Sequence, residues 1–262
     1  MRHCSFLLLS CVTYGVAGQS SDTIKGRFAA PEGSQCVMVE DGSFAAYLRR
    51  LPLAPPGTSV LLHTGHLKHR QDVHAAVIDM SLGHRDLQQC ADAVMRLRAE
   101  FLYTVERPDE IAFDFTNGFR AEWKRWRRGE RIKVIGNRCS WVSGAKPDSS
   151  HAELLRFMDC VFMYAGTLSL AKELQDASAY PIQPGDVFIK GGSPGHAMIV
   201  VDVARTTKGR TFFLLAQSYM PAQQIHVVRN SDSRAGAWYA QEGDLLRTPE
   251  WTFSWTDRKR WP

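Results

Sequence analysis

The sequence has 262 residues, of which 44% are hydrophobic, 23% charged and 10% aromatic. This is an ordinary globular composition, and it excludes disordered, collagen-like and coiled-coil chains. The formal charge of +5 is too small to indicate a nucleic-acid partner. The mean hydropathy is −0.25, and the long apolar run lies at the N-terminus, so a polytopic membrane protein is excluded.

Residues 1–18 have the pattern of a signal peptide. A short positive start precedes an apolar run over residues 6–17, and the small residues Val16-Ala17-Gly18 offer a cleavage point. Lipoprotein anchoring at Cys11 is a less favoured alternative, because the apolar run continues beyond this cysteine. We therefore expect an exported protein, periplasmic or extracellular, with no membrane span after signal cleavage.

The remaining chain divides into a polar stretch over residues 19–35, expected to be a linker or extended arm, and a single domain over residues 36–262. An exported compartment permits disulfides, but the sequence leaves their pairing open. No pair of the mature cysteines has the C-x-x-C spacing of a zinc ribbon. These four cysteines are Cys36, Cys90, Cys139 and Cys160.

Helical spacing of apolar side chains predicts helices over residues 43–51, 86–103, 119–128 and 151–175. In the second of these, Asp86 is the expected N-cap and Gln89 its capping-box partner. Cys90 then lies in the first turn, where the helix dipole and free amide groups favour a thiolate. The third helix is basic and carries Trp123 and Trp126.

Short apolar runs predict strands, and they are densest in the C-terminal half. Residues 196–204 are apolar almost throughout, so this strand is expected to be central and buried on both faces. We predict an α+β fold with a helix-rich N-terminal half and a C-terminal antiparallel β meander. The expected strands cover residues 36–39, 60–62, 75–78, 186–189, 196–204, 211–217 and 224–228.

Three residues could form a nucleophilic site. A thiol nucleophile needs a base within hydrogen-bond reach, and the base needs a third group to orient it. Cys90 is the candidate nucleophile, His196 the candidate base where a glycine-rich turn enters the central strand, and Gln217 the candidate orienting group at the end of the next strand. The plainer alternatives are a buried helix cysteine, a turn histidine and a polar strand end.

The segments Pro184-Gly-Asp-Val-Phe-Ile189 and Gly195-His-Ala-Met-Ile-Val-Val-Asp202 resemble NlpC-type papain-like cell-wall peptidases. The resemblance implies a papain-like core in which a cysteine opens the helix that packs on the sheet. It also implies a histidine at the start of the second strand and a polar residue on the third. Cys90, His196 and Gln217 match these roles in order. The motif around the cysteine departs from the family's pattern, because it reads Gln-Cys-Ala-Asp instead of Asp-Cys-Ser/Thr-Gly, and a helical block separates the cysteine helix from the histidine strand.

A second resemblance covers most of the mature chain. It is to an uncharacterised bacterial family that is catalogued as a domain of unknown function (forty-eight forty-six), and it implies membership without an activity. The segments that carry it are residues 86–100, 115–118, 165–170, 185–189, 214–223 and 248–251.

We therefore expect an exported cysteine hydrolase, an amidase or peptidase acting on cell-wall peptides, with no cofactor and no metal. Asn117, Trp123 and Ser218 are expected to bind the substrate. The alternative is a catalytically inactive domain of the same fold that binds envelope glycan or peptide through the basic helix over residues 119–128. A solvated helix face with its tryptophans turned inward is the plainer interpretation of that helix.

Four histidines gather within a short stretch that is expected to be a loop. Imidazole groups suit zinc or copper. The spacing matches no helical zinc motif, so we favour a solvated loop over a metal site. These residues are His63, His66, His69 and His74.

Overall fold

A computed structural model describes residues 22–231 and 236–262. The expected signal peptide lies outside the described residues. The helices are α1 (Ile24–Arg27), α2 (Phe44–Arg49), α3 (Cys90–Thr104), α4 (Trp123–Trp126), α5 (His151–Tyr164) and α6 (Thr167–Glu173). The strands are β1 (Ser34–Cys36), β2 (His74–Val77), β3 (Ala112–Asp114), β4 (Arg120–Glu122), β5 (Glu130–Ile135), β6 (Arg138–Ser143), β7 (Gln175–Asp176), β8 (Val187–Lys190), β9 (His196–Thr206), β10 (Thr211–Gln217), β11 (His226–Val228), β12 (Tyr239–Ala240), β13 (Leu245–Arg247), β14 (Thr252–Ser254) and β15 (Arg258–Arg260).

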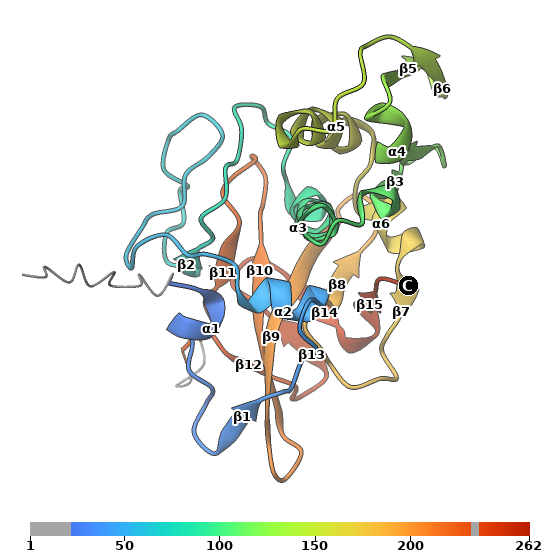
Figure 1. The fold of residues 1–262 in the computed structure, drawn as a ribbon. Helices are drawn as coiled ribbons and strands as arrows, with labels where there is room; N and C mark the ends of the chain where they lie inside the picture. Colours follow the sequence, from blue (N-terminus) through green and yellow to red (C-terminus); the bar gives the residue numbers. More distant parts are fainter. Residues whose placement is uncertain (1–21, 232–235) are drawn as a thin grey trace, which may run out of the picture.

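An antiparallel sheet forms the centre of the molecule (Figure 1). Its strands follow the order β2-β11-β10-β9-β8-β15-β7, while β1 also pairs with β9 and β12 with β10. The meander β8–β9–β10–β11 is the one predicted from the sequence, because each strand is an apolar run bounded by a turn. The prediction of a mixed helix and strand fold with a large antiparallel sheet is therefore confirmed.

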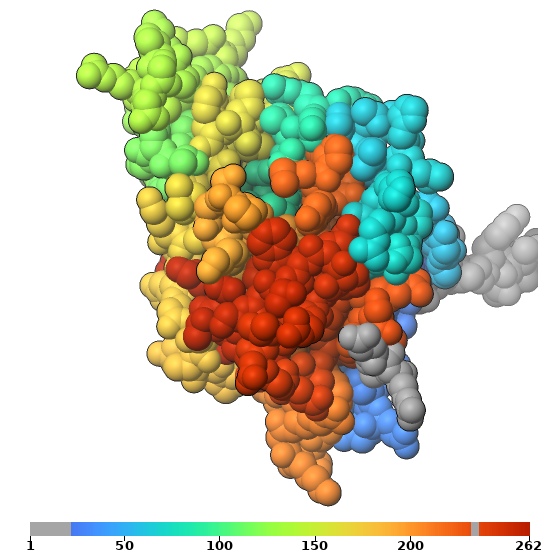
Figure 2. All heavy atoms as spheres, turned by 180° about the vertical axis from the view of Figure 1, so that it is seen from behind, coloured from blue at the N-terminus to red at the C-terminus, as the bar shows by residue number. Residues whose placement is uncertain are grey.

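Strand β9 is buried on both faces, as its apolar sequence predicts. Ile199 and Val201 belong to a core shared with α2, α3 and α5. Met198 and Val200 point to the other face, into a second core with β13 and β14. Figure 2 shows that the C-terminal residues, in red, lie across the middle of this second face. Helix α3 and the C-terminal segment thus cover opposite faces of the same strands.

The prediction of a helix-rich N-terminal half is wrong. Helices α1 and α4 have four residues each and α2 has six, and strands β1 to β4 lie among them. Residues 119–128 form β4 and the single turn of α4 instead of one basic helix. Gly129 follows at a φ of 98°, where a Cβ atom would lie 2.3 Å from the carbonyl oxygen of Ala145. This close approach requires glycine and stops the helix.

The helix expected over residues 151–175 is divided. Helix α5 begins after its N-cap Ser150 and ends at Tyr164, and α6 begins after Gly166. No single helix among the described residues is long and apolar enough to cross a membrane, whereas α5 and α6 meet that criterion only as a pair bent by 104°. Cys160 is 7% exposed and belongs to the core that contains α3.

Candidate active site

Cys90 is the first residue of α3, and α3 packs against β9. The N-cap is Gln89, whose backbone N–H donates to Asp92 Oδ2 at 2.9 Å. The N-cap predicted at Asp86 is wrong, because this carboxylate accepts the backbone N–H of Ala222 at 2.7 Å instead. Cys90 nevertheless lies in the first turn. Asp86 connects the residues that precede α3 to the loop that follows β10.

Backbone N–H groups act on the Cys90 thiol. Those of Ala91, Ala197 and Cys90 itself lower its pKa, so they lie near the sulfur. Because Ala197 directly follows His196, the sulfur lies beside the first residues of β9. The side chain is only 7% exposed. Burial, followed by the nearby Asp92 carboxyl, raises the pKa of Cys90 to about 11. Burial thus outweighs the backbone donors, and the thiolate expected from the helix start is not the resting form at pH 7.

His196 begins β9 at a point where the chain is tightly packed. A Cβ atom at the preceding Gly195 would lie 2.4 Å from Gly192 O and from Thr167 Oγ1. Burial lowers the pKa of His196 to about 4, so its ring is neutral at pH 7. The rings of Tyr219 and Trp251 lie 4.9 Å and 5.2 Å from it between centroids.

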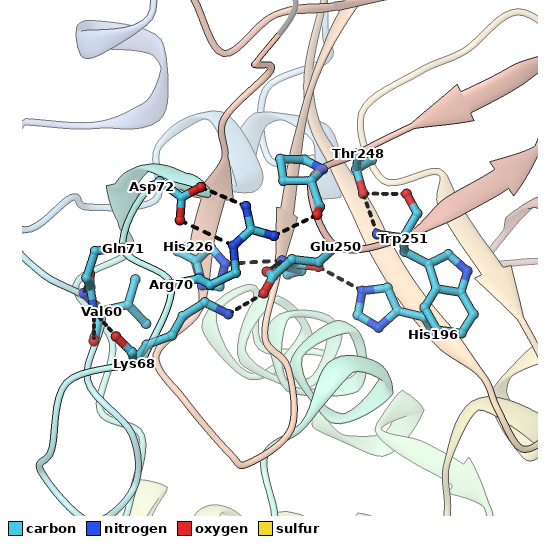
Figure 3. A network of polar contacts seen from close by, with 12 residues as sticks. Val60, Lys68, Arg70, Gln71, Asp72, His196, His226, Thr248, Glu250 and Trp251 are labelled. Atoms are coloured by element: carbon cyan, nitrogen blue, oxygen red, sulfur yellow. Dashed lines mark hydrogen bonds and ion pairs between the residues drawn. The ribbon is translucent and has the colours of Figure 1, made fainter.

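Gln217 joins His196 to groups that the sequence did not suggest. Its Oε1 lies 2.7 Å from His196 Nε2, and its Nε2 donates to Glu250 Oε2 at 2.7 Å. The same amide nitrogen lies 3.2 Å from His226 Nε2, and Lys68 Nζ lies 2.6 Å from Glu250 Oε1. Figure 3 shows Lys68, Glu250 and His226 side by side next to His196.

The three predicted substrate-binding residues have other surroundings. Trp123 is fully buried, with Phe157 at 5.7 Å between ring centroids, so its ring is not available to a substrate. Asn117 lies on the turn between β3 and β4, and its amide nitrogen donates to the carbonyl of Asn137 at 2.9 Å, on the β5–β6 hairpin. Trp123 is therefore a core residue, whereas Asn117 stays exposed with its amide bound to the hairpin.

Ser218 is at the site but has a structural role. It is fully buried, and its Oγ lies 2.9 Å from the carbonyl oxygen of Gln88 and 2.7 Å from that of Gln223. Its hydroxyl therefore links the end of β10 to the residues before α3. This link fixes Cys90 relative to Gln217, and it leaves no free hydroxyl for a substrate.

The histidine-rich stretch supplies Lys68 to the site. His74 Nε2 lies 3.0 Å from Thr58 O, and His63 Nδ1 lies 3.4 Å from Ala222 O. Within residues 22–231 and 236–262, no group of three His, Cys, Asp or Glu side chains is placed to hold a metal ion. The contacts of this stretch therefore involve backbone carbonyls and the Lys68–Glu250 pair.

Sequence reasoning missed Lys68, His226 and Glu250. Lys68 and Glu250 are 182 positions apart, so no local pattern joins them. Glu250 does lie in the segment 248–251 that carries part of the family resemblance, and this motif was the signal available for it.

Comparison with known proteins gives one finding. A protein-family model described as "Domain of unknown function (4846)" matches residues 24–260. No match was found among curated proteins or among solved structures.

Proposed function

The chain belongs to this family of unknown function. We propose that it is an exported cysteine hydrolase that cleaves amide bonds in cell-wall peptides. The observation that carries the proposal is the meeting of two chain segments. Cys90 opens α3, and the backbone N–H of Ala197, the residue that follows His196, lowers the pKa of its thiol, so the sulfur lies near the start of β9. His196 is in turn held by Gln217 at 2.7 Å. Nucleophile, base and orienting group are the three parts that such a site requires.

A papain-like core is part of the proposal. Its support is the helix that begins at the cysteine and packs against an antiparallel strand beginning at the histidine. Gln217 ends the neighbouring strand, β10, which pairs with β9. The cell-wall substrate rests on the expected signal peptide and on the resemblance of residues 184–189 and 195–202 to NlpC-type peptidases.

The chemistry begins from a neutral thiol and a neutral imidazole. In the proposed reaction, Cys90 Sγ attacks the amide carbonyl carbon while its proton passes to His196 Nδ1. His196 then gives this proton to the departing amine nitrogen as the C–N bond breaks, which leaves a thioester. Water attacks the thioester with the same histidine as base, and the cleaved thiolate regains a proton.

In the proposed reaction, backbone N–H groups would stabilise the negative oxygen that forms during attack. The N–H groups of Cys90 and Ala197 both lower the pKa of the Cys90 thiol, so they lie near the sulfur. They lie at the free N-terminus of α3 and the start of β9, beside the atom to which the carbonyl carbon would bond. Fixed amide donors of this kind lower the barrier without reorganisation.

The second candidate is a binding domain of the same fold without catalysis. The pKa of Cys90, raised to about 11, favours this alternative, because a buried neutral thiol is a poor nucleophile unless a base takes its proton. The two functions differ in whether the thiol forms a covalent intermediate.

The test is cleavage of purified cell-wall peptides, followed by mass spectrometry of both products and protein. We expect amide hydrolysis and a transient acyl group on Cys90. The Cys90→Ser variant should lose both, and His196→Ala should lower kcat about 10²- to 10⁴-fold. Cys160→Ser is the matched control, since Cys160 is equally exposed and burial also raises its pKa to about 11. Wild-type protein that binds these peptides without cleavage or acylation would establish the binding domain instead.

A further inference from the structure

We propose that Glu250, paired with Lys68, is a positioning residue that fixes the side-chain amide of Gln217 and thereby keeps the proton of His196 on Nε2. Its catalytic meaning rests on the proposed hydrolase function, because it leaves Nδ1 as the basic nitrogen. The geometric claim is independent of that function. Figure 3 shows the pair next to His196 and His226.

The amide of Gln217 has polar partners on both of its ends. The residue is 1% exposed, so water cannot easily replace these partners. One end of the amide lies 2.7 Å from His196 Nε2, and the other faces Glu250 and His226. Because an amide has an accepting oxygen and a donating nitrogen, the partners decide which end faces which group.

Glu250 sets the first constraint. A carboxylate only accepts hydrogen bonds, so the group 2.7 Å from Glu250 Oε2 must be the Gln217 NH₂. Lys68 Nζ lies 2.6 Å from the other carboxylate oxygen, and the two side chains are 7% and 9% exposed. The lysine thus balances the negative charge of a carboxylate that is largely removed from water.

His226 sets the same constraint independently. Its Nδ1 lies 3.0 Å from the carbonyl oxygen of Gln224, which can only accept, so Nδ1 carries the proton. Burial lowers the pKa of His226 to about 3, and the neutral ring therefore offers Nε2 as an acceptor. This acceptor lies 3.2 Å from the Gln217 nitrogen. Glu250 and His226 both require the NH₂ end.

The oxygen end of Gln217 therefore faces His196, and the ring nitrogen at 2.7 Å must be an N–H donor. A reversed amide would place its oxygen against Glu250 and the unprotonated nitrogen of His226. Three acceptors would then meet without a proton, which a buried site strongly disfavours. Glu250 and His226 together thus determine the tautomer of His196 through the amide of Gln217.

The test reads the tautomer directly, without substrate. Full-length protein is labelled with ¹⁵N-histidine, and two-bond ¹H–¹⁵N spectra distinguish the Nε2–H and Nδ1–H forms, with His196→Gln assigning the signal. We expect the Nε2–H form in the wild type. In Glu250→Gln, which can present either amide end to Gln217, the Nδ1–H fraction should rise about tenfold.

The matched control is Glu242→Gln, which neutralises an exposed carboxylate paired with Arg210. It should leave the His196 spectrum unchanged. A wild-type protein with the Nδ1–H form overturns the proposal whether or not the variants fold. So does a folded Glu250→Gln with a wild-type tautomer, which would make the pair merely structural. Because no turnover is measured, an inactive protein with a Glu250-dependent tautomer would refute the hydrolase and leave this inference standing.

Discussion

Asp186 is fully buried and anchors two arginines of the C-terminal segment. Its Oδ2 accepts Arg258 Nη1 at 2.5 Å, and its Oδ1 accepts Arg260 Nε at 2.6 Å. It also accepts the backbone N–H of Gln183, in the turn before β8, at 3.1 Å. The arginines lie more than seventy positions away, where sequence reasoning could not connect them.

Removing this carboxylate should be costly. In Asp186→Ala, Arg258 keeps its charge at 1% exposure without a counter-ion. Breaking a buried pair in this way costs about 3–5 kcal/mol, so the free energy of unfolding measured with urea should fall by this amount. Glu242→Ala, which breaks an exposed pair, should leave the midpoint nearly unchanged. Equal effects of the two variants would contradict this account of Asp186.

The turn between β8 and β9 holds His196 in place through close packing. Gly195→Ala would put a methyl group within 2.4 Å of a backbone oxygen and a threonine hydroxyl oxygen. The start of β9 must then shift, and such overpacking costs about 1–3 kcal/mol of stability. Thermal unfolding should show the loss, and the His196 signal in the histidine spectrum should move. Gly166→Ala is the control, because a Cβ atom there meets nothing within 4 Å. A His196 signal that stays in place in Gly195→Ala would contradict the expected shift.

Elements with strong local patterns could be predicted from the sequence. Strands β8, β9 and β10 are apolar runs between turns, and α3 keeps an apolar stripe, so these elements and the positions of Cys90, His196 and Gln217 on them follow from local rules. The same rules failed over residues 119–128, where they predict one basic helix but the structure has the hairpin strand β4 followed by the short helix α4. Apolar spacing also continues through Gly166, so the break between α5 and α6 has little periodic signal.

The parts of the site that escaped prediction are those that depend on contacts between distant segments. The pKa of Cys90 is set by burial, which a helix N-cap pattern does not report. The basic neighbours of Trp123 suggest a substrate-binding side chain, yet its ring lies in the core, turned inward as the plainer interpretation of that stretch predicts. Lys68 and Glu250 come from loops whose residues form no repeating pattern.

At the scale of the whole molecule, two histidines and two carboxyl groups have opposite effects on how the free energy of unfolding changes with pH. Burial lowers the pKa of His196 to about 4 and that of His226 to about 3, so the unfolded chain takes up their protons first as the pH falls below 6.5. Burial raises the pKa of Asp92 to about 8 and that of Glu173 to about 7, so the unfolded chain loses those protons first as the pH rises above about 4. A falling pH therefore lowers the free energy of unfolding through the two histidines, and a rising pH lowers it through the two carboxyl groups.

The free energy of unfolding should consequently vary little between about pH 5 and pH 6.5, where the two effects cancel. It should fall between about pH 6.5 and pH 8, by about 1.4 kcal/mol per pH unit for each carboxyl not yet ionised in the folded state. Asp92→Asn removes one opposing carboxyl. Its stability should decline less above pH 6.5 and begin to decline below it, as urea titrations at several pH values would measure. An unchanged profile in this variant would mean that Asp92 is already ionised in the native protein.

Lys68 and Glu250 lie 182 positions apart in the chain, and this separation affects the order in which the parts of the site come together. Contacts between distant positions form late, after the intervening chain has been made and folded. Cys90 and His196 are translated before Glu250, so a growing chain carries both residues before it carries the one that holds Gln217 in place. During synthesis the His196 ring would therefore lack a Gln217 amide held in one orientation. Completion of the fold would orient Gln217, and under the proposed function it would also complete the site.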